Sequence, residues 1–200
     1  MRGQKPGARP AASAIVLAGG DSRRMGRDKA LLPVRGRPLI ALIVDRLAGR
    51  FDDILISAGH GGDDRRFPGQ TVVSDAAPGQ GPLMGIATAL PRVRHDLAFV
   101  IACDIPHIDL DFVERLIKRA GGCDLALPDR GDGRYEPLFA VYRKTVAGPA
   151  HDILAAGGRS ILDLLDRVRV GHVAVPPGVR IGNINTESDY RRFLRDPSSL

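Results

Sequence analysis

The sequence predicts an α/β fold with a mostly parallel central sheet and helices on both faces. Short apolar runs recur at positions 14–18, 54–56, 71–73 and 97–101. None of these runs alternates with polar residues, which is typical of strands buried on both faces of a parallel sheet. Helical patterns lie between the runs, and this alternation predicts parallel strands joined by crossover helices.

The expected helices lie between the apolar runs and are marked by amphipathic spacing. Residues 38–47 and 82–90 each begin with a proline, which the first turn of a helix tolerates, and continue with apolar residues on one face. Residues 109–120 show the same spacing and end before a Gly-Gly pair, which favours a helix stop. We therefore expect three helices that connect the buried strands.

The last third of the chain is less regular. Residues 135–142 and 170–175 are predicted to form strands, and residues 143–156 and 160–168 are predicted to form helices separated by a Gly-Gly pair. At 186–189, the sequence Thr-Glu-Ser-Asp has the spacing of a helix capping box, with Asp in place of the usual Glu at the third position. A final helix is therefore expected to begin there.

A single domain is predicted for residues 13–200. The chain has 200 residues, which falls within the usual size of one domain, and it contains no internal repeat. Residues 1–12 form a basic leader that carries three of the six net positive charges (29 Lys and Arg against 23 Asp and Glu). Elsewhere basic and acidic residues interleave and aromatic residues are few, so we expect no nucleic-acid partner.

The sequence has no feature typical of a membrane or secreted protein. No apolar run approaches the ~20 residues of a membrane span, and residues 1–12 lack the apolar core of a secretory signal. The two cysteines, Cys103 and Cys123, lack the spacing of a metal or redox motif, which favours a reducing compartment. We therefore expect a cytoplasmic protein with no membrane partner.

The most informative stretch is the loop at residues 17–29, LAGGDSRRMGRDK, which follows the first predicted strand. Ligands of open α/β sheets bind beyond the carboxyl ends of the strands, where this loop is expected to lie. Gly19 and Gly20 allow backbone N–H groups to approach an anion closely. The cationic side chains around these glycines are Arg23, Arg24, Arg27 and Lys29. The spacing fits neither a GxGxxG loop nor a Walker A loop, and it indicates a cradle for a triphosphate.

Two carboxylates follow other predicted strands. Asp104 comes soon after the apolar run 97–101 and is therefore expected near the same ligand crevice. A carboxylate beside a triphosphate suits Mg²⁺, which binds one or two carboxylates together with phosphate oxygens. The alternative is an Asp that caps the following turn. Asp75 follows the run 71–73, and its candidate partners are a sugar hydroxyl, the metal ion or the turn itself.

These motifs, taken in order, resemble those of the molybdenum cofactor guanylyltransferases, which belong to the wider nucleotidyltransferases with a Rossmann-like fold. The pattern LAGGxSxRMGxDKxxL spans residues 17–32. The similarity continues along the chain at 74–85, 103–106, 136–142 and 183–186. It covers almost all of the chain between positions 14 and 194.

The resemblance implies transfer of GMP from GTP to the phosphate of molybdopterin, with Mg²⁺ as cofactor and with the guanine dinucleotide and pyrophosphate as products. Lys29, Arg23 and Asp104 would be catalytic, and Asp104 would also bind the metal ion. Asn183 and Asn185 would bind the acceptor. The implied nucleotide-binding residues are Leu17, Ala18, Gly19, Gly20, Lys29, Ser57, Asp75 and Asp104. Ser57 stands where the family often has an Asn that contacts the nucleotide.

Other functions are open at this point. Relatives that transfer CMP typically carry LAAG where this chain has LAGG, and our hypothesis is that Gly19 gives room for a larger base. Transfer to a sugar 1-phosphate and a non-catalytic nucleotide-binding protein are further alternatives, although Lys29 and Asp104 favour catalysis. GTP and molybdopterin are the expected small-molecule partners, together with transient docking to other proteins of the cofactor pathway.

Overall fold

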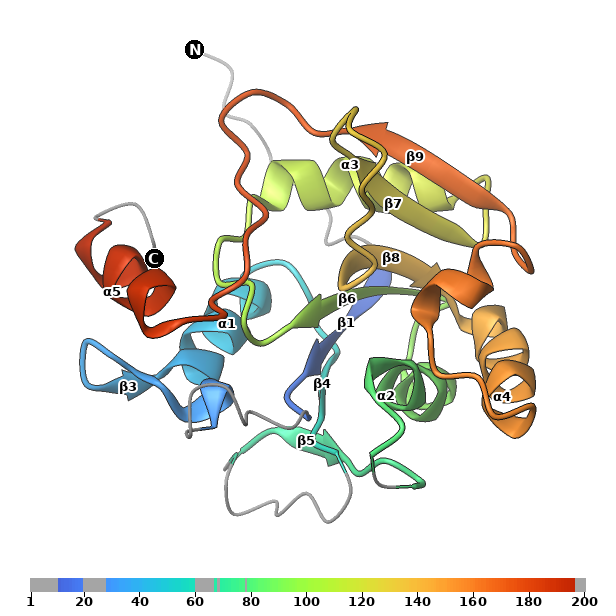
Figure 1. Ribbon diagram of the computed structural model, residues 1–200, viewed down its shortest axis with the longest axis horizontal. Coiled ribbons are helices and arrows are strands. Elements are labelled where there is room, and N and C mark those ends of the chain that lie inside the picture. The colour runs from blue at the N-terminus through green and yellow to red at the C-terminus, as the bar shows by residue number, and fades with distance from the viewer. Residues whose placement is uncertain (1–10, 20–27, 60–66, 68, 78, 197–200) are drawn as a thin grey trace.

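The computed structural model describes residues 11–19, 28–59, 67, 69–77 and 79–196. Its centre is a seven-stranded sheet with the strand order β5-β4-β1-β6-β8-β7-β9 (Figure 1). The strands are β1 Ala12–Leu17, β4 Ile54–Ser57, β5 Thr71–Val73, β6 Leu97–Ala102, β7 Leu125–Asp129, β8 Phe139–Arg143 and β9 Val170–Ala174. Neighbouring strands are parallel except where β8 runs antiparallel between β6 and β7. The predicted α/β fold with a mostly parallel sheet is confirmed.

The strand register brings the carboxyl ends of the parallel strands to one edge of the sheet. Leu17 at the end of β1 lies opposite Ser57 of β4 on one side and Ala102 of β6 on the other. Ser57 in turn lies opposite Val73, the last residue of β5. Because β1 and β6 are central and buried along nearly their whole length, their sequences are continuous apolar runs.

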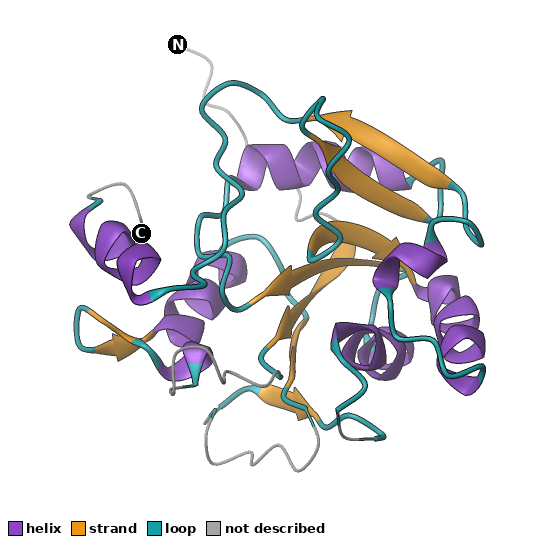
Figure 2. Ribbon diagram, viewed as in Figure 1, coloured by secondary structure: helices purple, strands orange, loops and turns teal. Residues whose placement is uncertain are grey.

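Helices cover both faces of the sheet (Figure 2). One face shares an apolar cluster with α1 Leu39–Ala48, α3 Leu110–Ala120 and α5 Glu187–Arg195. The other face shares a second cluster with α2 Pro82–Ala89 and α4 Ala147–Ala155. The short elements are the hairpin strands β2 Pro33–Val34 and β3 Arg37–Pro38 and the 3-10 turns η1 Lys29–Leu31, η3 Leu90–Arg92, η4 Lys144–Val146 and η5 Ile161–Leu164.

The helices expected at 38–47, 82–90 and 109–120 correspond to α1, α2 and α3. Pro82 occupies a first-turn position of α2, as expected. Pro38 does not, because it is the last residue of the β2–β3 hairpin, and α1 begins only at the next residue.

The strand and helix predicted at 135–142 and 143–156 both begin later in the chain. The backbone N–H of Phe139 donates to the carbonyl oxygen of Glu136 at 3.0 Å, and this turn delays the start of β8. Arg143 still belongs to β8, so that η4 and α4 replace the single expected helix. The sequence pattern therefore identified both elements but not the point where one gives way to the other.

Of the last three predicted elements, the strand and the capping box are confirmed and the helix at 160–168 is wrong. Residues 160–168 contain η5 instead of the expected helix, whereas 170–175 contains β9 and 186–189 forms the expected capping box at the start of α5. The expected leader, residues 1–12, lies outside the described residues up to position 10, and its last residue already belongs to β1. Within the described residues, no helix is long and apolar enough to cross a bilayer.

Phe99 on β6 is the aromatic centre of the first apolar cluster, and its replacement tests how that cluster is packed. Its fully buried ring stacks on Phe51 with centroids 6.1 Å apart and meets Phe139 edge-on at 5.0 Å. Phe99→Ala should lower the free energy of unfolding by about 3–5 kcal/mol, because it leaves a cavity among rigid neighbours. Urea unfolding followed by circular dichroism measures this loss, with Phe99→Leu as the milder control. An effect of Phe99→Ala no larger than that of Phe99→Leu would contradict the packing.

Candidate active site

The candidate active site lies where the parallel strands end. Ala18 follows β1, Ser57 ends β4, and Asp75 and Asp104 lie two residues beyond β5 and β6. The backbone is hydrogen-bonded across this edge, since the N–H of Ala18 donates to the carbonyl oxygen of Ser57 at 2.7 Å. In open α/β sheets, this edge is the usual position of a ligand crevice. The structure therefore places these four residues at one edge of the sheet, and their roles in binding stay predictions.

Lys29 is held by two partners that lie far from it in the sequence. Its Nζ atom donates to Oδ2 of Asp104 at 2.8 Å and to Oδ1 of Asn185 at 2.9 Å. The side chains of Lys29 and Asp104 are only 18% and 17% exposed, so water screens their ion pair weakly. Lys29 begins η1, and this turn is fixed by Asp28, whose carboxylate accepts a hydrogen bond from the N–H of Ala30 at 3.0 Å. The lysine is thus presented on a short, capped turn.

Asp104 has one oxygen available for a further ligand. Its backbone carbonyl accepts a hydrogen bond from the N–H of Ile184 at 2.7 Å, which joins the end of β6 to the segment before α5. Its Oδ2 atom is bonded to Lys29, but its buried Oδ1 atom has no hydrogen-bond partner within the described residues. Buried carboxylate oxygens normally have partners, so this atom fits the role of a ligand to a hard cation such as Mg²⁺.

A metal ion at Asp104 would need oxygens from a substrate. Within the described part of the chain, no group of three or more His, Cys, Asp or Glu side chains is arranged to hold a metal ion. Mg²⁺ commonly binds one or two carboxylates and completes its coordination with phosphate oxygens and water. The neighbouring Cys103 is no rival nucleophile, because burial raises the pKa of its thiol to about 12.

Ser57 and Asp75 form a second cluster. The hydroxyl of Ser57 donates to Oδ1 of Asp75 at 3.1 Å, and Ser57 is only 2% exposed. Helix α2 passes close above them, since a Cβ added at Gly85 would lie 2.7 Å from Oγ of Ser57. Ser57 thus contacts Asp75 instead of facing solvent, and the expectation that Ser57 contacts the nucleotide directly stays a prediction.

Gly19 is packed against the backbone that follows β4. A Cβ at position 19 would lie 2.8 Å from the nitrogen and 3.0 Å from the Cα atom of Gly59. Gly59 has a φ of +67°, which favours glycine, and its carbonyl oxygen accepts a hydrogen bond from the N–H of Asp75 at 3.1 Å. The room that glycine provides at position 19 is therefore filled by protein backbone.

Of the remaining predicted site residues, the structure describes some and leaves others outside the described ranges. Leu17 contributes its carbonyl oxygen, which accepts a hydrogen bond from the N–H of Cys103 at 3.0 Å. Asn183 is half-buried on the segment that carries Asn185. Gly20 and Arg23, together with Arg24 and Arg27, lie outside the described residues. Their proposed contacts with phosphate stay predictions.

Sequence reasoning assigned no separate role to Glu136. Glu136 lies in the turn that leads into β8, near enough to Asp104 for the two carboxylates to interact. Burial, followed by the negative charge of Asp104, raises the pKa of Glu136, while Arg130 acts in the opposite direction. The signal that would have identified it is the antiparallel direction of β8, which the sequence pattern does not reveal.

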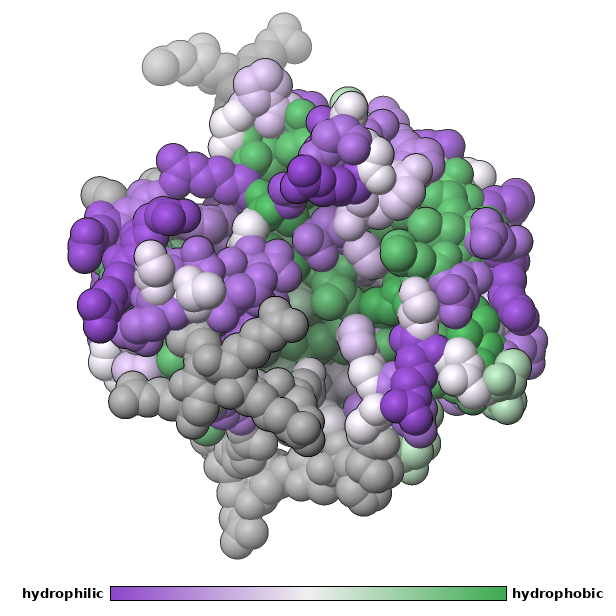
Figure 3. All heavy atoms as spheres, viewed as in Figure 1, coloured by the Kyte–Doolittle hydropathy of each residue, from purple (hydrophilic) through white to green (hydrophobic). Residues whose placement is uncertain are grey.

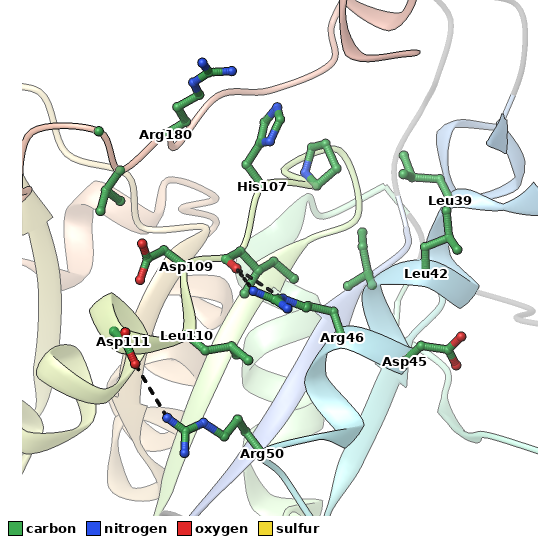
Figure 4. Close-up of a pocket in the computed structure, with 15 residues that line it drawn as sticks. Leu39, Leu42, Asp45, Arg46, Arg50, His107, Asp109, Leu110, Asp111 and Arg180 are labelled. Carbon is green, nitrogen blue, oxygen red and sulfur yellow. Dashed lines mark hydrogen bonds and ion pairs between the residues drawn. The ribbon is translucent and has the colours of Figure 1, made fainter. Parts of the chain in front are cut away.

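A separate cavity of about 790 Å³ lies between α1 and the loop that joins β6 to α3 (Figure 4). Arg46 in this cavity donates to the carbonyl oxygen of Ile108, and Arg50 lies 3.7 Å from a carboxylate oxygen of Asp111. Arg180 at its rim pairs with a carboxylate as well. Because its arginines are bound to the protein itself, we assign the active site to the strand ends and not to this cavity.

Comparison with known proteins agrees with this geometry. Residues 14–170 match the family model of the MobA-like NTP transferase domain. A molybdenum cofactor guanylyltransferase from Pseudomonas putida is 37% identical over 90% of this chain and 96% of its own length. A probable molybdenum cofactor guanylyltransferase from Pelotomaculum thermopropionicum is 35% identical over 89% of both chains.

Solved structures show the same fold. Molybdopterin-guanine dinucleotide biosynthesis protein A from Archaeoglobus fulgidus superposes with a TM-score of 0.77 and 26% identity over 90% of this chain and 95% of that one. At 16% identity and a TM-score of 0.67, the 2-C-methyl-D-erythritol 4-phosphate cytidylyltransferase from Thermus thermophilus shares the fold over 90% of this chain and 96% of its own. The extent of the family match and the identities of 35–37% show that this chain belongs to the MobA-like NTP transferases and, within them, to the molybdenum cofactor guanylyltransferases.

Proposed function

We propose that this protein transfers GMP from GTP to the phosphate of molybdopterin in an Mg²⁺-dependent reaction. An oxygen of the acceptor phosphate forms a bond to the α-phosphorus of GTP, and the bond to the β-phosphate oxygen breaks to release pyrophosphate. The observation that carries the proposal is the position of Lys29, which joins Asp104 on the proposed nucleotide side to Asn185 on the proposed acceptor side.

The reaction does not require a strong general base. The acceptor phosphate is ionised at neutral pH, so the protein has to place two anions in line and offset the charge that develops between them. Lys29 suits this task because its ammonium group has three N–H donors, of which Asp104 and Asn185 occupy two. The third donor can bind a phosphate oxygen without loss of either contact.

Asp104 is the proposed metal ligand. Its buried Oδ1 atom accepts no hydrogen bond from the described residues, and a metal ion would satisfy it. When bound, Mg²⁺ supplies positive charge that stabilises the triphosphate and the departing pyrophosphate. The protein holds the carboxylate ready through Lys29 on the other oxygen and through Ile184 on the backbone.

On the nucleotide side, we propose that Asp75 binds the nucleotide and that Ser57 orients Asp75. The Ser57 hydroxyl is almost completely buried and bonded to the Asp75 carboxylate, so it would act by orienting that carboxylate. The backbone of Leu17, Ala18 and Gly19 forms the adjoining wall at the end of β1. We also propose a cytoplasmic location and transient docking with other proteins of the cofactor pathway.

A nucleotide panel tests the proposed reaction. Pyrophosphate release is measured with GTP, CTP or ATP, with Mg²⁺, and with molybdopterin either present or omitted. We expect release with GTP that depends on both Mg²⁺ and molybdopterin. Equal release from CTP would favour CTP as an alternative nucleotide donor. Release with a sugar 1-phosphate in place of molybdopterin would favour a sugar phosphate as the acceptor.

Asp104→Asn should lower turnover by roughly 100-fold, the scale for removing one electrostatic contact to a transition state. Asn keeps the shape and can still accept a hydrogen bond from Lys29, but it lacks the charge that binds a metal ion. Asp109→Asn in the same loop is the control, because Asp109 only caps α3 by accepting a hydrogen bond from the N–H of Phe112, and Asn caps equally well. Unchanged turnover or an unchanged Mg²⁺ requirement in Asp104→Asn would overturn the metal assignment.

Gly19→Ala tests the hypothesis that glycine at this position provides room for a larger base. The structure argues against this hypothesis, because the space beside Gly19 is filled by Gly59, which is bonded to Asp75. The new Cβ would displace that backbone, so we expect a higher KM for GTP and for CTP alike. The two KM values and the unfolding midpoint should be measured together. An unchanged GTP-to-CTP ratio would refute the hypothesis, even if the variant is less stable.

Gly85→Ala and Ser57→Ala form a double-mutant cycle on the nucleotide side. Gly85→Ala should weaken GTP binding, because its Cβ lies too close to Oγ of Ser57 and pushes that hydroxyl away from Asp75. Ser57→Ala removes the atom that the new Cβ would crowd. The double variant should therefore lose less binding free energy for GTP than the sum of the losses in the two single variants, with a coupling energy of about 0.5–3 kcal/mol. Dissociation constants from calorimetry test this coupling, and additive losses would contradict it.

A further inference from the structure

The segment before α5 is fixed by an extended capping box. The Oδ2 atom of Asp189 accepts hydrogen bonds from the N–H of Thr186 at 2.9 Å, from its hydroxyl at 2.8 Å and from the N–H of Asn185 at 3.2 Å. The Thr186 hydroxyl oxygen accepts in return from the N–H of Asp189 at 3.1 Å. These bonds lower the pKa of Asp189, which is therefore an ionised acceptor at neutral pH.

Asn185 connects this capping box to the lysine of the active site. Its own N–H and that of the next residue, Thr186, donate to Asp189, and the N–H of the preceding Ile184 donates to the carbonyl oxygen of Asp104 at 2.7 Å. Its side-chain Oδ1 atom then accepts the hydrogen bond from Lys29 at 2.9 Å. The Lys29 ammonium group thus contacts the residue that precedes the N-cap of α5, 156 residues away in the sequence.

Helix α5 is anchored to both segments that carry the ion pair. The Tyr190 hydroxyl donates to the carbonyl oxygen of Pro33, on the strand that follows the turn of Lys29. The Phe193 ring meets His107 edge-on with centroids 5.4 Å apart, on the loop that follows Asp104. Helices α5 and α1 contribute to the same apolar cluster, and Figure 3 shows mainly hydrophilic residues on the visible surface where Figure 1 draws α5. The helix contacts the protein mainly through the face that bears these two aromatic residues.

We propose that Thr186 and Asp189 are positioning residues for Lys29: the capping box of α5 holds Asn185, and Asn185 holds the lysine against Asp104. The segment from 176 to 196, which lies beyond the family match at 14–170, is then a structural part of the active site and not a terminal appendage. The kinetic consequence rests on the proposed function, but the placement of Lys29 does not.

The competing explanation is that the capping box only stabilises α5. Both explanations give a less stable helix when Thr186 or Asp189 is replaced, so stability alone cannot separate them. Only the positioning role changes the environment of Lys29. Glu187 provides a matched control, because it lies in the same first turn and pairs with Arg191 at 3.1 Å but makes no bond to Asn185.

Chemical labelling of lysines reports this environment directly and needs no substrate. The chain has four lysines, Lys5, Lys29, Lys118 and Lys144. Acetylation of the unliganded full chain, followed by mass spectrometry, gives the labelling rate of each. Lys118 is exposed and serves as the reference for a freely accessible lysine. Lys144 serves as the reference for a hydrogen-bonded lysine, because its Nζ donates to the carbonyl oxygen of Val93 at 2.7 Å.

We expect Thr186→Val and Asp189→Ala to raise the labelling rate of Lys29 relative to Lys118 by roughly tenfold, the factor that corresponds to the loss of about 1.4 kcal/mol of restraint. Thr186→Ser, which keeps the hydroxyl, should restore the slow rate, and Glu187→Gln should leave it unchanged. The labelling rate of Lys144 should be constant throughout, which confirms that the variants are folded. If the labelling rate of Lys144 changes in Asp189→Ala, that variant is replaced by Asp189→Asn, for which we expect a smaller rise in the labelling rate of Lys29.

An unchanged Lys29 rate in folded Thr186→Val and Asp189→Asn would overturn the proposal, as would an equal rise in Glu187→Gln. A kinetic arm measures kcat and KM for pyrophosphate release. The positioning role predicts a lower kcat with little change in KM for GTP in Thr186→Val, and Thr186→Ser should recover it. If the unaltered protein releases no pyrophosphate at all, the proposed function fails, whereas the labelling result still decides the role of α5.

Discussion

The ion pair between Lys29 and Asp104 is the interaction on which the active site depends. Both side chains are more than four-fifths buried, so each charge would be unfavourable without the other. The parallel pairing of β1 and β6 brings the ends of these two strands to the same edge, where the pair joins the turn of Lys29 to Asp104. Asp104 is thereby held with Oδ2 paired to Lys29, while its buried Oδ1 atom accepts no hydrogen bond from the described residues.

Close packing shapes the nucleotide side of the same edge. At Gly19 and Gly85, a single methyl group would collide with Gly59 and with Ser57, respectively. Both contacts lead to Asp75, through the carbonyl oxygen of Gly59 and through the hydroxyl of Ser57. The position of this carboxylate therefore depends on residues that bear no charge. Glycine at these two positions thus leaves room for the groups that contact Asp75, and interiors packed at crystal-like density transmit even small displacements.

The sequence predicts the features of the fold that depend on local pattern. The strands at 14–18 and 97–101 are continuous apolar runs because they are buried on both faces, and the capping box at 186–189 depends on residues three positions apart. Strand direction and register leave no such local trace, so the insertion of antiparallel β8, and with it the position of Glu136 near Asp104, could not be predicted. The same holds for the site: the motif at 17–29 indicates Lys29, but nothing local connects it to Asn185, 156 residues away.

The charge balance at this edge explains how several carboxylates can lie where we propose that two phosphates bind. Asp104 is paired with Lys29, Asp75 accepts a hydrogen bond from Ser57, and Glu136 lies near Arg130 with a pKa raised chiefly by burial. Each negative group is thus offset or made less acidic by its surroundings. A neutral amide at Asn185 fits the same requirement, because a second carboxylate there would bind Lys29 more strongly but would add negative charge on the proposed acceptor side. Lys29 is thus bonded to one charged and one neutral group, and its ammonium group keeps a third N–H donor beyond these two bonds.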